Sequence, residues 1–478
     1  MSDLAMRPTS IIFYNNFASH LLCAYNPNMY YPGLPHRWSD EDWKTCVRML
    51  AGFGFTTFEF WLEPRMFCRE ALDSDLGIEY TRQMNAVIGF THDFGMKTEL
   101  ITGLATSGAD WRTLCPNLDD EWRTIRFLWD AWTKRFTGLD SVGIFPGDPG
   151  ACSRHGCTAE TYIDKSVEIA GLIRRNLPRA EVEFHTWGPP FFGWGIIHMG
   201  PESRGEFIGK DQASAWTFSK ERADKSMAHV LARLKDFPEG TVVAINLGFN
   251  SDGNPGGESD ARAWAAAIAE TNPIRTWDYS LTEGEGTVLP HYRFDRLFER
   301  RRQERDAAPY SGGICYSMTP MLNQLTAFEA ARSFRIPDSD PKAVAEEFFT
   351  RLFGDAGREV VQYFPLFEAM PGWGSYQKCA LSRDEYHGKM ATLATILEDL
   401  KPCVVDTPFH PSVDEYRQEI LFFARLCADL SGPSPDYDAL RRAYWDRVYR
   451  IYDALPGHPD PRAQGATDEL IRFFAQWQ

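Results

Sequence analysis

Side chains that can hold a proton or bind a sugar follow most of the apolar runs in the first two thirds of the sequence. They are carboxylates, amides, aromatic rings and one imidazole, and each comes at or near the C-terminal end of its run. The set comprises Asn15, Asn16, Glu59, Trp61, Glu99, Asp148, His185, Trp187, Asn246, Asp278, Tyr279 and Tyr316. Since neither a His-rich cluster nor a Gly-x-Ser-x-Gly motif accompanies them, we expect carboxylate chemistry.

Two carboxylates of this set fit the roles that hydrolysis of a glycosidic bond requires. One acid protonates the leaving oxygen, while the other attacks the sugar or activates water. Asp148 is our candidate for the acid, because it lies on a Gly-Asp-Pro-Gly turn just after the apolar run 141–145. The same turn could also be purely structural, since its residue types are ordinary turn formers. Asp278, between two aromatic residues, is the leading catalytic partner, and Glu59 and Glu99 compete with it.

The other residues of the set are candidates for binding the substrate. Amide and imidazole groups, such as those of Asn15 and His185, can hydrogen-bond to sugar hydroxyls, and aromatic faces can stack on sugar rings. Trp216, in the long loop 188–218, is a further candidate. Trp187 could instead belong to the core, because most of the 15 Trp side chains are expected to be buried.

Several charged residues have a structural alternative. Glu59 could pair with Arg65 or Lys97 instead of acting on a substrate. Three arginines near the predicted rim of the site, Arg65, Arg154 and Arg275, could bind an anionic sugar such as a uronate. They could equally form salt bridges, which is the more ordinary use of an arginine on a strand.

The ten cysteines are scattered and mostly lie in apolar contexts, which is typical of reduced, buried thiols in a cytoplasm. Cys152, His155 and Cys157 are an exception, because they lie together just after the Asp148 turn. A zinc site needs a fourth ligand and usually a Cys-x-x-Cys spacing, which this segment does not have. We therefore expect a thiol pair that stabilises the loop, and we predict neither a metal nor a cofactor.

The elements that must position these residues repeat along the chain. Three times an amphipathic helix ends in Phe and Gly and leads into an apolar strand. The predicted strands are 11–14, 55–61, 97–101, 141–145, 181–187, 241–247, 275–280 and 312–317. Strands alternating with helices in this number predict a (β/α)8 TIM barrel, whose active site lies at the C-terminal ends of the strands. A doubly wound sheet is the alternative, but no Gly-x-Gly-x-x-Gly follows the first strand.

The sixth strand has an alternative, because residues 211–218 could also form a short strand. From about residue 322 onward the pattern is helical, so we predict a catalytic barrel over residues 1–335 and an all-helical C-terminal domain over residues 336–478. The helical domain is also a candidate homodimer interface.

Composition excludes several classes of partner. The chain has 478 residues and a net charge of −16, which argues against binding to nucleic acid. It has no apolar run long enough to cross a membrane, no polybasic stretch, and no basic and apolar pattern of a signal peptide at its beginning. We therefore expect a cytoplasmic protein with a carbohydrate partner.

Two segments resemble a group of barrel glycosidases that contains the β-N-acetylhexosaminidases of family 20, the α-glucuronidases of family 67 and related uncharacterised bacterial families. They are Phe145-Pro-Gly-Asp-Pro-Gly-Ala-Cys152 and the end of the predicted barrel, from Gly312-Gly-Ile-Cys-Tyr-Ser to Leu352-Phe-Gly354. The resemblance covers about 140–370 and implies an acid at Asp148 and a base on strand six or seven, best matched by Asp278. Family 20 has Asp-Glu after strand four, whereas Pro149 follows Asp148 here, so its substrate-assisted mechanism is not carried over.

The leading hypothesis is an exo-acting glycoside hydrolase that uses paired carboxylates. The alternative is a metal-dependent sugar or sugar-acid lyase or isomerase, with Glu59, Glu99, Asp278 and His185 around a divalent cation. A sugar-binding barrel without catalytic activity is a third. The separation of the carboxylates would decide the stereochemical outcome: about 5 Å indicates retention and roughly 6.5–9.5 Å indicates inversion.

Overall fold

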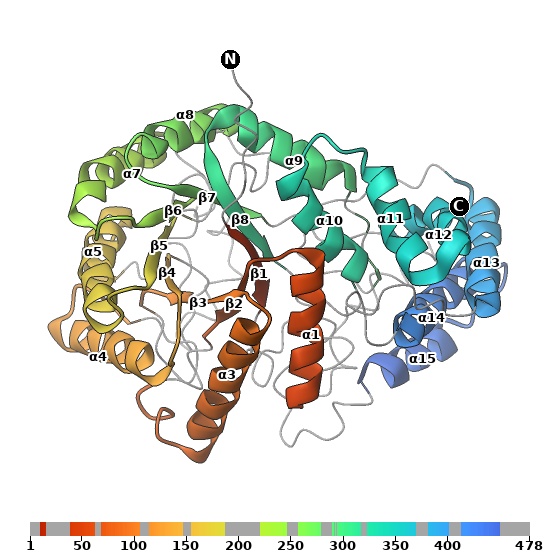
Figure 1. Ribbon diagram of the computed structural model, residues 1–478, viewed down its shortest axis with the longest axis horizontal. Helices are drawn as coiled ribbons and strands as arrows, with labels where there is room; N and C mark the ends of the chain where they lie inside the picture. The colour runs from red at the N-terminus through yellow and green to blue at the C-terminus, as the bar shows by residue number, and fades with distance from the viewer. Residues whose placement is uncertain are drawn as a thin grey trace. The chain divides into compact units, whose positions relative to one another are not determined.

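A closed barrel of eight parallel strands, paired in chain order, forms the first part of the molecule (Figure 1). The computed structural model describes residues 10–15, 39–62, 68–105, 114–146, 154–186, 220–245, 257–278, 289–290, 292, 294–316, 323–369, 381–400 and 413–449. The strands are β1 Ser10–Asn15, β2 Thr57–Trp61, β3 Lys97–Gly103, β4 Ser141–Phe145, β5 Glu181–His185, β6 Val242–Ala244, β7 Ile274–Asp278 and β8 Tyr310–Tyr316. The predicted parallel β/α architecture is confirmed.

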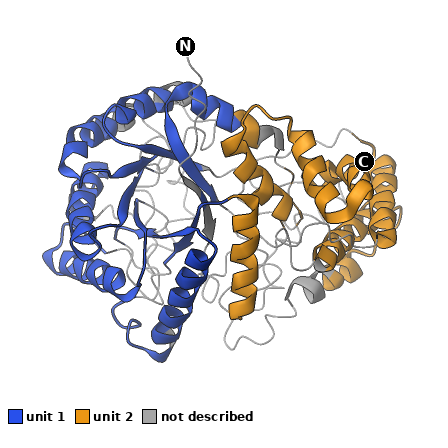
Figure 2. Cartoon of the chain, viewed as in Figure 1, with its two compact units in different colours: residues 1–17, 55–279, 300–315 blue, residues 18–54, 280–299, 316–478 orange. Residues whose placement is uncertain are grey.

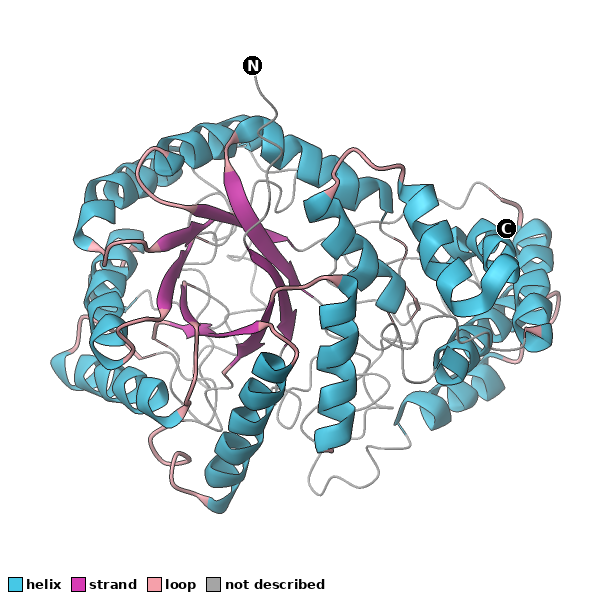
Figure 3. Cartoon of the chain, viewed as in Figure 1, coloured by secondary structure: helices cyan, strands magenta, loops and turns pink. Residues whose placement is uncertain are grey.

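A helix follows each of the eight strands. These helices are α1 Asp40–Phe53, α3 Asp75–Asp93, α4 Asp119–Arg135, α5 Ala159–Asn176, α7 Lys220–Arg233, α8 Gly257–Ala269, α9 Phe294–Ala307 and α10 Gln324–Arg335. Short 3-10 helices add η3 Arg154–Gly156 and η5 Leu234–Asp236. Figure 3 shows α3, α4, α5, α7 and α8 outside the ring of strands, so the strands are enclosed by the helices that connect them.

The helix-to-strand repeat has a simple physical cause. Ser74 and Thr158 cap the first turns of α3 and α5 with their side-chain oxygens. Gly95 and Gly138, which follow α3 and α4, have φ angles of 75° and 87°. A residue with a side chain is strained in this left-handed region, and glycine is not, so these positions let the chain turn from each helix into the next strand.

The sixth strand is the shortest. It spans only Val242–Ala244, whereas residues 241–247 were predicted. Residues 246–256 and the alternative strand 211–218 lie outside the described residues. The pairing of β6 with both β5 and β7 confirms that a strand of the barrel lies in this part of the sequence.

The chain divides into two compact units (Figure 2). One comprises residues 1–17, 55–279 and 300–315, and the other comprises residues 18–54, 280–299 and 316–478. The second unit therefore includes α1 and α10 together with the later helices α11 Pro341–Phe353, α12 Gly357–Tyr363, α13 Arg383–Asp399, α14 Val413–Ser431 and α15 Tyr437–Tyr449, and with η7 Gly354–Ala356 and η8 Phe364–Ala369. The domain boundary between residues 335 and 336 stays a prediction.

Aromatic side chains form much of the core of the second unit. Phe348 on α11 packs its ring against Phe53 of α1 and Phe328 of α10, with centroid distances of 6.0 and 5.4 Å. Arg335 donates a hydrogen bond to the carbonyl oxygen of Gly54, where α1 ends. From residue 323 onward every described element is a helix. No helix of the described part is long and apolar enough to cross a membrane.

Candidate active site

The interior of the barrel contains an unusual layer of charged side chains. Glu99 on β3, Glu183 on β5 and Arg275 on β7 come from alternate strands, as side chains of one interior layer do in such barrels. Arg275 Nη1 lies 2.5 Å from Glu183 Oε2 and 4.0 Å from Glu99 Oε2. Arg275 Nη2 lies 2.5 Å from Oε1 of Glu181, at the beginning of β5.

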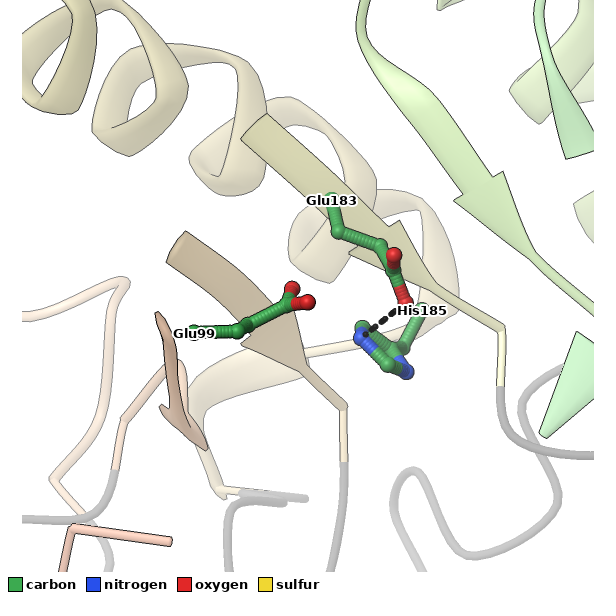
Figure 4. Close-up of side chains that lie close together, drawn as sticks. All are labelled: Glu99, Glu183 and His185. Atoms are coloured by element: carbon green, nitrogen blue, oxygen red, sulfur yellow. Dashed lines mark ion pairs between the residues drawn. The ribbon is translucent and has the colours of Figure 1, made fainter. Parts of the chain in front are cut away.

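Glu183 connects this layer to the end of its strand. One of its oxygens faces Arg275, and the other, Oε1, lies 3.0 Å from His185 Nε2 (Figure 4). Burial would raise the pKa of Glu183, but Arg275 and His185 outweigh burial and hold this pKa below its usual value. Glu183 is therefore the ionised partner of Arg275.

The pKa values of Glu59 and Glu99 are raised, whereas that of Glu183 is lowered. Burial raises the pKa of Glu59 well above its usual value, and the neighbouring carboxyl groups of Glu99 and Glu183 raise it further. Burial and then Glu183 likewise raise the pKa of Glu99. Neither oxygen of Glu59 has a hydrogen-bond partner among the residues that the structure describes. The surroundings of these two acids therefore favour the protonated form, whereas those of Glu183 favour the ionised form.

A small residue makes room for these groups. A Cβ atom at Gly143 on β4 would lie 3.0 Å from His185 Nε2 and 3.1 Å from Ile101 Cγ1. Real Cβ atoms rarely come so close to other atoms, so the backbone of β4 faces the imidazole directly. A larger residue at this position would require the side chain of His185 or Ile101 to shift by a few tenths of an ångström.

Aromatic rings lie above the charged layer, toward the C-terminal ends of the strands. The Phe145 ring is 5.3 Å from Trp61, 5.1 Å from Trp277 and 5.7 Å from His185, between ring centroids. Trp61 is only 5% exposed, which makes it part of this cluster rather than an open stacking surface. Phe145 is the last residue of β4, so the cluster fixes the C-terminal end of this strand.

The predicted site residues fall into three groups. Glu59, Trp61, Glu99 and His185 are described and lie together in the barrel interior. The backbones of Asn15, Asp278 and Tyr316 lie at the last positions of β1, β7 and β8, but their side chains are outside the description. The remaining six are Asn16, Asp148, Trp187, Trp216, Asn246 and Tyr279, which lie outside the described residues. The catalytic and binding roles of all these residues stay predictions.

Sequence reasoning missed Glu183, although residues 181, 183 and 185 alternate along one strand and so share one face. For Arg275 the sequence left two roles open, binding of an anionic sugar or a salt bridge. The structure shows the salt bridge, because Arg275 is 5% exposed and is paired with Glu183 and Glu181.

The same cluster has the composition of a cation site. One donor atom each from Glu99, Glu183 and His185 lie within 4.8 Å of one another. Carboxylate oxygens and imidazole nitrogens are ordinary ligands for divalent metals. However, Arg275 already places a positive charge 2.5 Å from Glu183, and a cation bound to these ligands would be repelled by it.

Two solved structures share this fold along most of the chain. A variant of the O-GlcNAc hydrolase of Thermobaculum terrenum matches with a TM-score of 0.53 and 12% identity, over 99% of this chain and 94% of that one. CpGH84B matches with a TM-score of 0.51 and 9% identity, over 98% and 77% of the two chains. No protein-family model and no curated protein matches the sequence. Since the identities are so low, these similarities show that this chain has a fold that glycoside hydrolases use. The grouping with families 20 and 67 stays a prediction.

Proposed function

We propose that this protein is an exo-acting glycoside hydrolase in which Asp148 is the general acid. The observation that supports this proposal best is the closed eight-strand barrel, which the chain shares over 99% of its length with an O-GlcNAc hydrolase. Active sites of such barrels lie at the C-terminal ends of the strands. Asp148 comes three residues after β4, and Asp278 is the last residue of β7.

Asp278 is a better partner for Asp148 than Glu59 is. Glu59 is the third of the five residues of β2 and is completely buried. Burial raises its pKa well above the usual value, which disfavours the ionised form that a nucleophile or a general base needs. We therefore assign Glu59 to the support of the barrel interior and Asp278 to catalysis.

The proposal is tested by hydrolysis of a panel of glycosides, with a β-N-acetylglucosaminide as the first substrate. Asp148→Asn should lower kcat/KM by about 10²–10⁴-fold, which is the usual contribution of a general acid. Asp355→Asn is the control, because the Asp355 side chain is 95% exposed and lies on η7. Full activity of Asp148→Asn would rule out its role, and sugar binding without turnover across the panel would favour a non-catalytic barrel.

The products of hydrolysis show whether cleavage is exo or internal, and whether the configuration at the anomeric carbon is retained or inverted. Release of single sugars from the chain end supports exo action, whereas a mixture of internal fragments contradicts it. The configuration of the first-formed anomer, followed by proton NMR, distinguishes a retaining from an inverting pair of carboxylates. The same assay applied to Asp278→Asn shows whether this residue is the second carboxylate.

A metal-dependent lyase or isomerase remains the second candidate, because Glu99, Glu183 and His185 have the donor atoms for a cation. It predicts that a chelator abolishes turnover and that Mn²⁺ or Mg²⁺ restores it. The glycosidase proposal predicts that hydrolysis is the same before and after treatment with the chelator. Activity that depends on the added metal would replace the first proposal with the second.

A further inference from the structure

Two buried cysteines face each other across the loops that follow β3 and β4. The Sγ atoms of Cys115 and Cys157 lie 3.4 Å apart, although 42 residues separate them in the sequence. Cys115 is fully buried and Cys157 is 7% exposed, and Leu118 packs against both. The expected thiol pair therefore includes Cys157, but its described partner is Cys115, and Cys152 lies outside the described residues.

The backbone on each side holds the two sulfur atoms in place. Leu118 N donates to Cys115 O at 3.1 Å, and Cys115 N donates to the Glu121 carboxylate. On the other side, Cys157 directly precedes Thr158, the residue that caps α5. Because each sulfur is positioned by contacts of its own segment, their proximity follows from the fold of both loops.

A further contact ties the same two loops together. Asn117 Nδ2 donates to the carbonyl oxygen of His155 at 3.0 Å. His155 has a φ angle of 52°, in the left-handed region that residues with side chains rarely adopt. His155 lies two residues before Cys157, so this contact lies close to the pair of sulfur atoms.

We propose that Cys115 and Cys157 form a reversible disulfide that links the loop after β3 to the loop after β4. The sulfurs must approach by roughly 1.4 Å to reach the usual S–S length of about 2.05 Å. With oxidised glutathione as the oxidant, Cys157, the more exposed thiol, attacks the glutathione disulfide and releases one glutathione thiol. Cys115 then attacks Cys157 in the mixed disulfide and releases the second, so the protein loses two protons and two electrons.

The link would restrain the segment that contains Asp148. This segment lies between the end of β4 and η3, so the disulfide would fix its C-terminal end to the neighbouring loop. An effect on hydrolysis rests on the proposed function. Formation of the disulfide does not, because it can be measured without a substrate.

The test treats the full-length protein with oxidised glutathione, blocks the remaining thiols with iodoacetamide and maps the peptides by mass spectrometry. We expect one cross-linked pair containing Cys115 and Cys157, lighter by two hydrogens than the two reduced peptides together and separated by dithiothreitol. A disulfide between Cys152 and Cys157, stoichiometric zinc in the purified protein, or complete alkylation of both thiols after oxidation would each overturn the proposal.

Thermal unfolding supplies a second measurement. Oxidation should raise the Tm by several degrees, because the link closes a long loop in the unfolded chain, and dithiothreitol should reverse the rise. Cys115→Ala should abolish the difference between the oxidised and reduced protein. Cys46→Ala is the matched control, since Cys46 is also buried but lies in α1, and it should keep the difference. An equal Tm for the oxidised and reduced wild-type protein would contradict the link.

Discussion

At the scale of single residues, the barrel interior contains the ion pair of Glu183 and Arg275, and beside it two buried acids whose pKa values are shifted in the opposite direction from that of Glu183. Glu183 has both Arg275 and His185 as partners, whereas Glu59 and Glu99 are buried acids with raised pKa values. A buried charge is tolerated only when it is paired, and among these three buried glutamates only Glu183 lies within 3 Å of Arg275. The stability of the barrel should therefore depend on which carboxyl group is changed.

Glu183→Gln should be much more destabilising than Glu181→Gln. Both glutamates lie 2.5 Å from Arg275, but the Glu183 side chain is fully buried and that of Glu181 is 36% exposed. Loss of the buried partner should lower the free energy of unfolding by about 3 kcal/mol, and loss of the exposed one by about 1 kcal/mol or less. Urea denaturation measures both values, and equal costs would contradict the assignment of Glu183 as the main partner.

The raised pKa values of Glu59 and Glu99 give the stability a definite pH dependence. Between the ordinary pKa of a glutamate and the raised one, the folded protein binds more protons than the unfolded chain. The free energy of unfolding should therefore fall as the pH rises through this window. The double variant Glu59→Gln/Glu99→Gln carries neutral side chains of similar shape and should lose this dependence. A Tm series at rising pH tests this, and parallel curves for the two proteins would contradict it.

At the scale of elements, the junctions between helix and strand determine how well the barrel is formed. Ser74 begins α3, and Gly95 ends the turn after it with a φ angle of 75°. The same helix contains Gly89, which is exposed and has an ordinary φ angle. Because a Cβ atom at either glycine would meet nothing within 4 Å, the two positions differ only in backbone conformation.

Alanine at these two positions should have opposite effects. Gly95→Ala should lower the free energy of unfolding by about 1–2 kcal/mol, the cost of a left-handed residue with a side chain. Gly89→Ala should raise it by about 0.5–1 kcal/mol, because alanine favours a helix. Chemical denaturation of the two variants gives the comparison, and a stabilising Gly95→Ala would show that this junction can do without glycine.

At the scale of the whole molecule, the two compact units are interleaved in the sequence. The second unit takes α1 from near the beginning of the chain and α10 to α15 from its second half. Phe348 of α11 packs on both Phe53 and Phe328, which precede the predicted boundary. A cut at residue 335 would expose these rings.

A fragment of residues 1–335 should therefore unfold at a lower temperature than the full chain, or without a cooperative transition. In the full chain, Phe348→Ala should lower the free energy of unfolding by about 3–5 kcal/mol, the usual cost of removing a buried phenyl ring. Calorimetry of both proteins tests this. A fragment with the thermal stability of the full chain would support an independent barrel domain that ends at residue 335.

The order of the helices and strands could be predicted from the sequence. The pairing of side chains inside the barrel could be predicted only in part. Hydrophobic periodicity and the Phe-Gly junctions are local signals, and they predicted the β/α alternation. The pairing of Arg275 with Glu183 joins residues 92 positions apart on β5 and β7, and it depends on how far each strand is shifted in the closed barrel. Cys115 and Cys157 meet for a similar reason, through two loops whose conformations the sequence does not specify. The prediction therefore placed Glu59, Glu99 and His185 on strands of the barrel, but it did not anticipate that Glu183 lies between His185 and Arg275.

Gly143 links the evolution of three neighbouring strands. A Cβ atom at this position would lie 3.0 Å from His185 Nε2 and 3.1 Å from Ile101 Cγ1, so a larger residue there requires one of these side chains to shift by a few tenths of an ångström. A substitution at position 143 should therefore be accepted more easily once residue 101 or residue 185 has become smaller. We expect positions 101, 143 and 185 to change together among relatives of this protein.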